Sequence, residues 1–214
     1  MAQDLSELFV RALSQHRFVR SPKRIRVVHR GATLVDTRDA LLVWQPGRVV
    51  PDYAVPRDAL ADPTLGVMVD DPDLVDHRLL PFDAFDTWLE EDERIFGHPR
   101  DPFHRVDARK TTRHVRVEID GVLLAESHAP TIVFETKLPP RIYFERAELH
   151  IEHFGPSTTR TRCAYKGTAS YLSARIGERV VEDVAWSYVR PLVDAPPIAG
   201  LVSFYDGRVR IIGG

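Results

Sequence analysis

The chain has 214 residues, and 31 acidic against 29 basic side chains leave a formal net charge of -2 at pH 7. This balance provides no overall attraction to nucleic acid or to an anionic membrane, so we expect neither as a partner. A single cysteine excludes an internal disulfide framework, and no apolar stretch approaches the roughly 20 residues that cross a bilayer. Basic residues other than four lysines are arginines, a bias typical of GC-rich bacteria. We therefore expect a cytoplasmic bacterial protein with one or two domains.

The first 20 residues predict an amphipathic helix, because Leu5, Leu8 and Leu13 recur on one face at helical spacing. Ser21-Pro22 ends this pattern. Short β-prone runs then alternate with turn residues, so residues 21–96 are predicted to form a first, shortened β domain. Closely spaced prolines in residues 51–78 favour a mostly irregular segment within it.

An acidic stretch lies near the end of this first domain, with ten carboxylates between Asp70 and Glu93. We interpret it as a solvated surface, with a helix around Trp88, and keep a partner or metal site as the alternative. Prolines and charges in residues 97–112 then indicate a linker, because prolines cannot continue a helix or a central strand.

Residues 113–214 predict a second β domain with stronger strand signals. Asp120-Gly121 joins two alternating runs and is typical of a type I′ hairpin turn. Further hairpins are expected around Gly177 and around Asp206-Gly207. The predicted fold is mainly β, with two tandem small antiparallel β domains and an N-terminal α-helix.

The two β domains resemble each other at an offset of 90 residues. Residues 24–45 align without gaps to residues 114–135, which pairs Gly31 with Gly121 and a tryptophan with a phenylalanine. Tyr53 falls on Tyr143 at the same offset. Paired hairpin glycines with matching strand patterns favour an internal duplication, in which the first copy lacks about 30 residues present in the second.

Several motifs of the second domain resemble, in order, the domain of unknown function numbered 427: LLAES, TIVFE, TRCAYKGTASY, VAWSYVRP and IAGLVSFY. The resemblance is strong over residues 113–208 and weaker over residues 23–95, which implies a tandem member. The family has no settled activity. It is distantly similar to β-tent domains, in which two antiparallel sheets meet at an angle. Many of those bind zinc through two cysteine pairs, which this chain lacks, and some hold small ligands in an aromatic cage.

The stretch from Ser157 to Tyr188 concentrates the candidate chemistry. Cys163 is the only cysteine and lies between Arg162 and Lys166 in the sequence, and nearby cations lower the pKa of a thiol. Cys163 is therefore a candidate nucleophile, with Lys166 or Arg162 stabilising developing negative charge. The alternative is a buried structural cysteine. Arg162 and Lys166 are also candidates for holding an anion, and a solvated basic loop is the alternative.

Aromatic residues form the other part of this candidate site. Trp186 and Tyr188 alternate on one strand and therefore share a face, which Tyr171 joins from the neighbouring strand. Phe204 and Tyr205 are expected in the same cluster. Such a cluster is either core or a cage for a flat or cationic ligand. From the family motifs, Glu135 supplies a carboxylate to the cage and Tyr143 lines it.

These observations lead to a preferred hypothesis and an alternative. The first is a pocket in the second domain only, which binds or acts on a small polar or aromatic molecule through the residues named above. Whether the protein is an enzyme stays open, with Cys163, Lys166 and Glu135 as the catalytic candidates. His150 and His153 lack a convincing further ligand, so neither a metal site nor another cofactor is expected. The alternative is a non-catalytic protein-interaction module that works through the acidic stretch or an edge strand.

Overall fold

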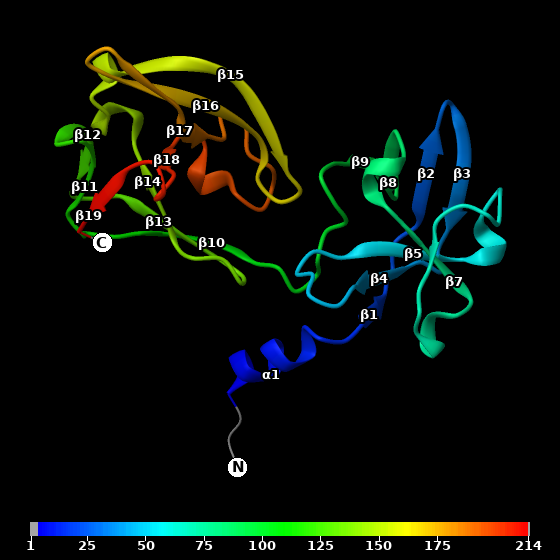
Figure 1. The fold of residues 1–214 in the computed structure, drawn as a ribbon. Helices are drawn as coiled ribbons and strands as arrows, with labels where there is room; N and C mark the ends of the chain where they lie inside the picture. Colours follow the sequence, from blue (N-terminus) through cyan, green and yellow to red (C-terminus); the bar gives the residue numbers. More distant parts are fainter. Residues whose placement is uncertain (1–3, 214) are drawn as a thin grey trace. The chain divides into compact units, whose positions relative to one another are not determined.

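Antiparallel strands dominate the computed structural model of the protein, which describes residues 4–213 (Figure 1). Strands take 49% of the residues and helical segments 12%, so the expectation of a mainly β protein is confirmed. The chain divides into two units, Met1–Pro102 and Phe103–Gly214, and every sheet lies within one unit. In the described part of the chain, no helix has the length and apolar character needed to cross a membrane.

The N-terminal helix is shorter than expected. Helix α1 covers Leu5–Ala12, whereas Arg17–Arg20, assigned to the helix from its sequence, form strand β1. β1 pairs with strand β4, Leu41–Trp44, over its whole length. The hydrogen bonds to this partner strand outweigh the weak local preference for continuing the helix.

Unit 1 contains two antiparallel sheets. The first has the order β1-β4-β5-β7-β6 and the second the order β3-β2-β8-β9. The strands not yet defined are β2 (Ile25–His29), β3 (Ala32–Thr37), β5 (Asp52–Pro56), β6 (Val67–Met68), β7 (His77–Leu80), β8 (Thr87–Glu90) and β9 (Glu93–Ile95). Short 3-10 helices lie between some of them: η1 (Arg57–Ala59), η2 (Pro72–Leu74) and η3 (Phe82–Ala84).

One expectation for unit 1 was wrong, and another holds only in part. Residues 51–78 contain β5, β6 and the start of β7, and β5 pairs with β7 inside the sheet, whereas turns, bends and short 3-10 helices make up the rest of this segment. Trp88 lies in strand β8 rather than in a helix, and its buried ring stacks on Phe82 at 5.1 Å between centroids. The Trp88 ring packs against aromatic and aliphatic side chains of the core. This segment therefore forms a strand, because strands suit residues that pack on one face.

Several carboxylates of the acidic stretch bind groups of unit 1 itself. Glu90 is buried, accepts a 2.8 Å hydrogen bond from the Tyr53 hydroxyl and forms an ion pair with Lys23. Asp92 forms an ion pair with Arg26 at 2.6 Å. These carboxylates therefore contribute to the packing and surface of unit 1.

Unit 2 also contains two antiparallel sheets, of seven and three strands. Their orders are β10-β13-β14-β18-β17-β16-β15 and β12-β11-β19. The strands are β10 (Val106–Lys110), β11 (Val115–Ile119), β12 (Val122–Ser127), β13 (Thr131–Glu135), β14 (Arg141–Phe144), β15 (Phe154–Cys163), β16 (Gly167–Ile176), β17 (Arg179–Ser187), β18 (Val202–Phe204) and β19 (Arg210–Ile212). The 3-10 helices are η4 (Arg146–Glu148), η5 (Ile151–His153) and η6 (Pro196–Ile198).

Two further sequence expectations differ from the structure of unit 2. Residues 106–110 of the expected linker form β10, which pairs with β13 over five positions. The two strands around Asp206-Gly207 do not form a hairpin, because β18 pairs with β14 and β17 whereas β19 pairs with β11 of the other sheet. The hairpins at Gly121 and Gly177 are present as predicted.

The strand registers of the two units repeat at the offset of 90 residues. Ile25 faces Thr37 as Val115 faces Ser127, and both hairpins are bulged at the same place. The pairing of β1 with β4 corresponds to that of β10 with β13 at the same offset. Strands β15, β16 and β17 extend the seven-stranded sheet beyond β18 and form the long yellow and orange hairpins of Figure 1.

The repeat breaks at the strand that follows. Leu42 faces Tyr53, whereas Thr131, not Ile132, faces Tyr143, so the register differs by one residue. A shift of one residue moves a side chain to the other face of a sheet. Tyr53 accordingly packs in the core between the sheets of unit 1, whereas Tyr143 lies in a separate cluster of unit 2.

The core of unit 2 lies between its two sheets. Phe144 and Phe204 pack there edge to face, with ring centroids 5.6 Å apart. Phe204 was expected in the aromatic cluster of the site, and this expectation was wrong because its side chain points into the core. The opposite face of the seven-stranded sheet carries Tyr143, Trp186 and their neighbours, so the two faces hold separate clusters.

Candidate functional site

A cavity of about 220 Å³ lies on the face of the seven-stranded sheet that carries Tyr143 and Trp186. Strand β13 supplies Glu135 at its last position, and the turn between β15 and β16 supplies Lys166. The lining combines aromatic rings with charged and hydroxyl groups: Glu135, Leu138, Pro139, Arg141, Thr161, Lys166, Tyr171, Trp186, Tyr188 and Tyr205.

A buried ion pair forms the charged part of this lining. The Lys166 ammonium donates to Glu135 Oε2, and the side chains of Lys166 and Glu135 are only 10% and 6% exposed. His104 Nε2 lies 3.2 Å from Glu135 Oε1, so both carboxylate oxygens have a partner. The His104 ring in turn stacks on Tyr165 at 4.0 Å between centroids. These contacts hold the carboxylate in one orientation.

The surroundings of Glu135 favour its ionised form. Burial alone would raise the pKa of this carboxyl, but the hydrogen bonds from His104 and Lys166 outweigh burial and hold the pKa below its usual value. Lys166 Nζ also lies 5.8 Å from the centre of the Tyr188 ring, a cation–π distance. The site therefore contains a carboxylate and a cation at fixed positions beside an aromatic surface.

Hydrogen bonds between side chains fix the aromatic wall. Trp186 Nε1 donates to the Tyr143 hydroxyl at 3.2 Å. The Tyr171 hydroxyl shares hydrogen bonds with Thr161 at 2.8 Å and with the Tyr205 hydroxyl at 3.2 Å. The Trp186 and Tyr205 rings lie 4.5 Å apart between centroids. These contacts hold the rings and hydroxyls of the wall in fixed positions.

Three phenols at or beside the wall, Tyr143, Tyr188 and Tyr205, have a raised pKa and stay protonated well above neutral pH. Burial is the main cause that raises the pKa of Tyr143 and of Tyr188. Burial and the hydrogen bond with Tyr171 raise the pKa of Tyr205 to about 12. These hydroxyls therefore act as neutral hydrogen-bonding groups.

A sequence profile of a domain of unknown function, DUF427, matches residues 107–213, half of the chain. The chain belongs to this family. The match begins within β10 and ends just after β19, so it includes every residue that lines the cavity. No curated protein matches the chain.

Within this family domain, the structure brings most of the expected site residues together. Glu135, Lys166, Tyr171, Trp186 and Tyr188 all line the cavity. Tyr143 is not among the lining residues, but its hydroxyl accepts a hydrogen bond from Trp186, which is. The aromatic stretch and the end of the TIVFE motif therefore meet at one place, although they are separated in the sequence.

Cys163 is half-buried against the aromatic cluster and is not part of the cavity lining. The cations expected around it have other partners. Lys166 binds Glu135, and the Arg160 guanidinium binds the backbone carbonyls of Ser157 and Thr159 at 2.9 and 2.6 Å. The structure thus favours the reading of Cys163 as a packing residue.

Arg162 does not reach the cavity either. Its neighbours Thr161 and Cys163 point to the aromatic cluster, and side chains alternate along a strand, so Arg162 lies on the exposed opposite face of β15. Arg141 is the arginine of the cavity lining. Its guanidinium pairs with Asp206 at 2.6 Å and lies 6.0 Å from the Trp186 ring.

Sequence reasoning missed His104, Arg141 and Thr161. His104 lies in the expected linker, 31 residues before its partner Glu135, and only the position of β10 beside β13 brings the two close. Thr161 reaches the site because it faces Ala169, two residues before Tyr171, across the β15–β16 pair, and this pairing was not predicted from the sequence. Arg141 is the first residue of β14 and has no distinguishing neighbour in the sequence.

Proposed function

We propose that the cavity of unit 2 binds a small molecule with a flat or aromatic body and a polar group. The observation that carries this proposal is the buried Glu135–Lys166 pair in the wall of a cavity. Transfer of two charges out of water is costly, and an apolar pair of similar shape is often equally stable or more so. Stability alone therefore gives no reason for this pair, whereas a ligand-binding site does.

The wall suggests what kind of molecule would fit. The Trp186 and Tyr205 rings offer flat apolar contact, and the Tyr171 hydroxyl offers a hydrogen bond beside them. The Lys166 ammonium can donate to an acceptor such as a carboxylate, while Arg141 supplies a second positive charge. The volume of about 220 Å³ is below the roughly 300–1,000 Å³ typical of drug-sized ligands, which favours a small metabolite.

Binding, rather than thiol chemistry, is the function proposed for this site. Nucleophilic catalysis needs the thiol within reach of the substrate and of a base. Cys163 packs against the aromatic cluster and does not line the cavity. Glu135 and Lys166 accordingly serve as ligand-orienting groups in this proposal.

A thermal-shift screen of small metabolites on the full chain tests the proposal. The matched control is Glu135→Gln/Lys166→Met, which removes both charges and keeps the side-chain shapes. We expect carboxylates with planar bodies to raise the melting temperature of the natural chain and to have little effect on the double variant. Compounds that stabilise both proteins equally would show that binding occurs elsewhere, and the proposal would then be wrong.

A further inference from the structure

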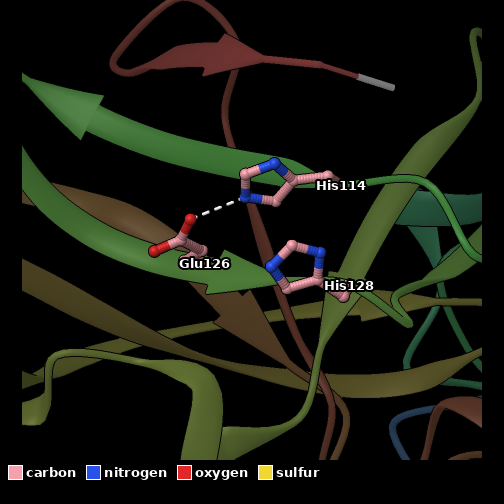
Figure 2. A group of neighbouring side chains, drawn as sticks. All are labelled: His114, Glu126 and His128. Carbon is pink, nitrogen blue, oxygen red and sulfur yellow. Dashed lines mark hydrogen bonds and ion pairs between the residues drawn. The ribbon is translucent and has the colours of Figure 1, made fainter.

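The second sheet of unit 2 carries a different group of chemically active side chains. Arg116 faces Glu126 across β11 and β12, so the same register places His114 opposite His128. Side chains two residues apart share a face of a strand, so His114, Glu126 and His128 all lie on the outer face of this hairpin. Figure 2 shows the three side chains pointing toward one another.

The distances within this group suit a metal ion. One ligand atom from each of His114, Glu126 and His128 lies within 4.8 Å of the others. The two imidazole rings stack at 4.0 Å between centroids with an angle of 10°. His114 Nε2 and Glu126 Oε1 are 2.6 Å apart and share a hydrogen bond, drawn as a dashed line in Figure 2.

We propose that His114, Glu126 and His128 bind a divalent zinc-like metal ion. Two imidazoles and a carboxylate form one of the three-ligand sets that proteins use for zinc, with the fourth position left to water. Bonds of about 2.1 Å in tetrahedral geometry place ligand atoms about 3.4 Å apart. The side chains reach this arrangement when the His114–Glu126 hydrogen bond opens, the metal takes the place of its proton, and the two stacked imidazoles rotate so that their nitrogens converge.

The same position in unit 1 lacks this capacity. At the offset of 90 residues, the counterparts are Arg24, Asp36 and Arg38. Arg24 Nε binds Asp36 at 2.6 Å, and a guanidinium donates hydrogen bonds but has no free pair for a metal. One ion per chain is therefore expected, although the two hairpins have the same register.

Arg116 is the main competitor of a metal at this site. Its terminal nitrogen pairs with Glu118 at 2.7 Å, and its Nε lies 4.0 Å from Glu126 Oε1. A positive charge so close to a ligand carboxylate opposes a divalent cation. Replacement of this arginine by glutamine should therefore tighten metal binding.

Equilibrium dialysis of tag-free, chelator-treated full chain against Zn²⁺, with elemental analysis, tests the proposal. We expect one ion per natural chain and at least about a tenfold loss of affinity in His114→Asn/His128→Asn, because two of three ligands are gone. Arg116→Gln should bind more tightly than the natural chain. Since His114 and His128 are exposed and Arg116 is only partly buried, the substitutions should change the melting temperature of the metal-free protein little.

The matched control is His150→Asn/His153→Asn. This pair also flanks a glutamate, with His150 Nδ1 at 3.4 Å and His153 Nε2 at 4.0 Å from Glu152, but it is not part of the group described above. The control variant should bind Zn²⁺ as the natural chain does. The proposal is overturned if the natural chain binds no zinc, if binding survives the loss of His114 and His128, or if it disappears with His150 and His153.

Discussion

Glu135 and Lys166 are the residues on which the proposed binding site depends. Each neutralises the other in a place where only 10% of the Lys166 side chain and 6% of the Glu135 side chain are exposed to water. Removal of Lys166 leaves the buried Glu135 carboxylate with the His104 contact alone, whereas removal of both partners leaves no buried charge of the pair. The single and double variants of this pair should therefore differ in their free energy of unfolding.

We predict that Lys166→Met lowers the free energy of unfolding by about 3–5 kcal/mol. Glu135→Gln/Lys166→Met should restore it to within about 1 kcal/mol of the natural chain, because no unpaired charge remains. Urea unfolding of the three proteins measures both values. A double variant as unstable as the single one would mean that the charges contribute through something other than their pairing.

The pH dependence of stability follows from the same pair. The pKa of Glu135 is lower in the folded protein than in the unfolded chain. Its ionised form therefore stabilises the fold above the unfolded pKa of about 4.3, and this contribution disappears as pH falls through the folded pKa. We predict that the natural chain and Glu135→Gln differ in stability near neutral pH and converge only when pH falls below the folded pKa, which lies under the usual value. A constant difference across this range would contradict the assigned pKa.

Single residues of the site were predictable where a local pattern marked them. Trp186 and Tyr188 alternate on a strand, and Glu135 ends a family motif, so both kinds of signal led to the cavity. His104 carried no such signal, because its contact with Glu135 depends on a strand pairing between distant residues. Arg162 and Cys163 were judged by sequence proximity, and the alternation of β15 separates them in space.

At the scale of an element, β14 shows how one strand serves both scaffold and site. Phe144 is fully buried in the core between the sheets, and Tyr143 supports the cavity wall on the other face. We predict that Phe144→Ala costs about 3–5 kcal/mol of unfolding free energy. Tyr143→Phe, which removes only the hydroxyl that accepts from Trp186, should cost about 1 kcal/mol. Chemical denaturation of both variants checks this order, and the reverse order would refute the assignment of the two faces.

Most strands were predictable from the alternation of apolar and polar residues and from turn residues, but the strand that each one pairs with was not always predictable. Asp120-Gly121 fixes a hairpin by its own backbone, with positive φ at both residues. Asp206-Gly207 is the same dipeptide, yet the strands on either side of it belong to different sheets. The available partner strands explain why no hairpin forms here. β18 pairs with β14 and β19 pairs with β11, whereas a hairpin between β18 and β19 would leave those edges of β14 and β11 unpaired.

At the scale of the whole chain, unit 2 contains all strands of its two sheets and the entire cavity. We therefore predict that residues 103–214 fold as an independent fragment. A fragment of residues 113–214 lacks β10, which leaves β13 unpaired along one edge and removes His104 from Glu135. Circular dichroism melting curves should show a cooperative transition for the first and a clearly less stable second. Equal stability would mean that β10 is dispensable.

The match in register between the two units favours the duplication inferred from the sequence. The units then differ in the strands that carry the candidate site, because β15, β16 and β17 belong to unit 2. The first unit retains the scaffold, and its acidic stretch binds its own side chains. We therefore propose that ligand binding takes place in unit 2 alone.

The location of ligand binding can be measured from the indole resonances in a ¹⁵N-labelled NMR spectrum of the full chain. The chain has three tryptophans, of which Trp186 lines the cavity while Trp44 and Trp88 lie in unit 1. Titration with a stabilising metabolite should shift the Trp186 indole signal, identified by its absence in Trp186→Phe, and leave the other two in place. Movement of Trp44 or Trp88 with a stationary Trp186 would contradict the account.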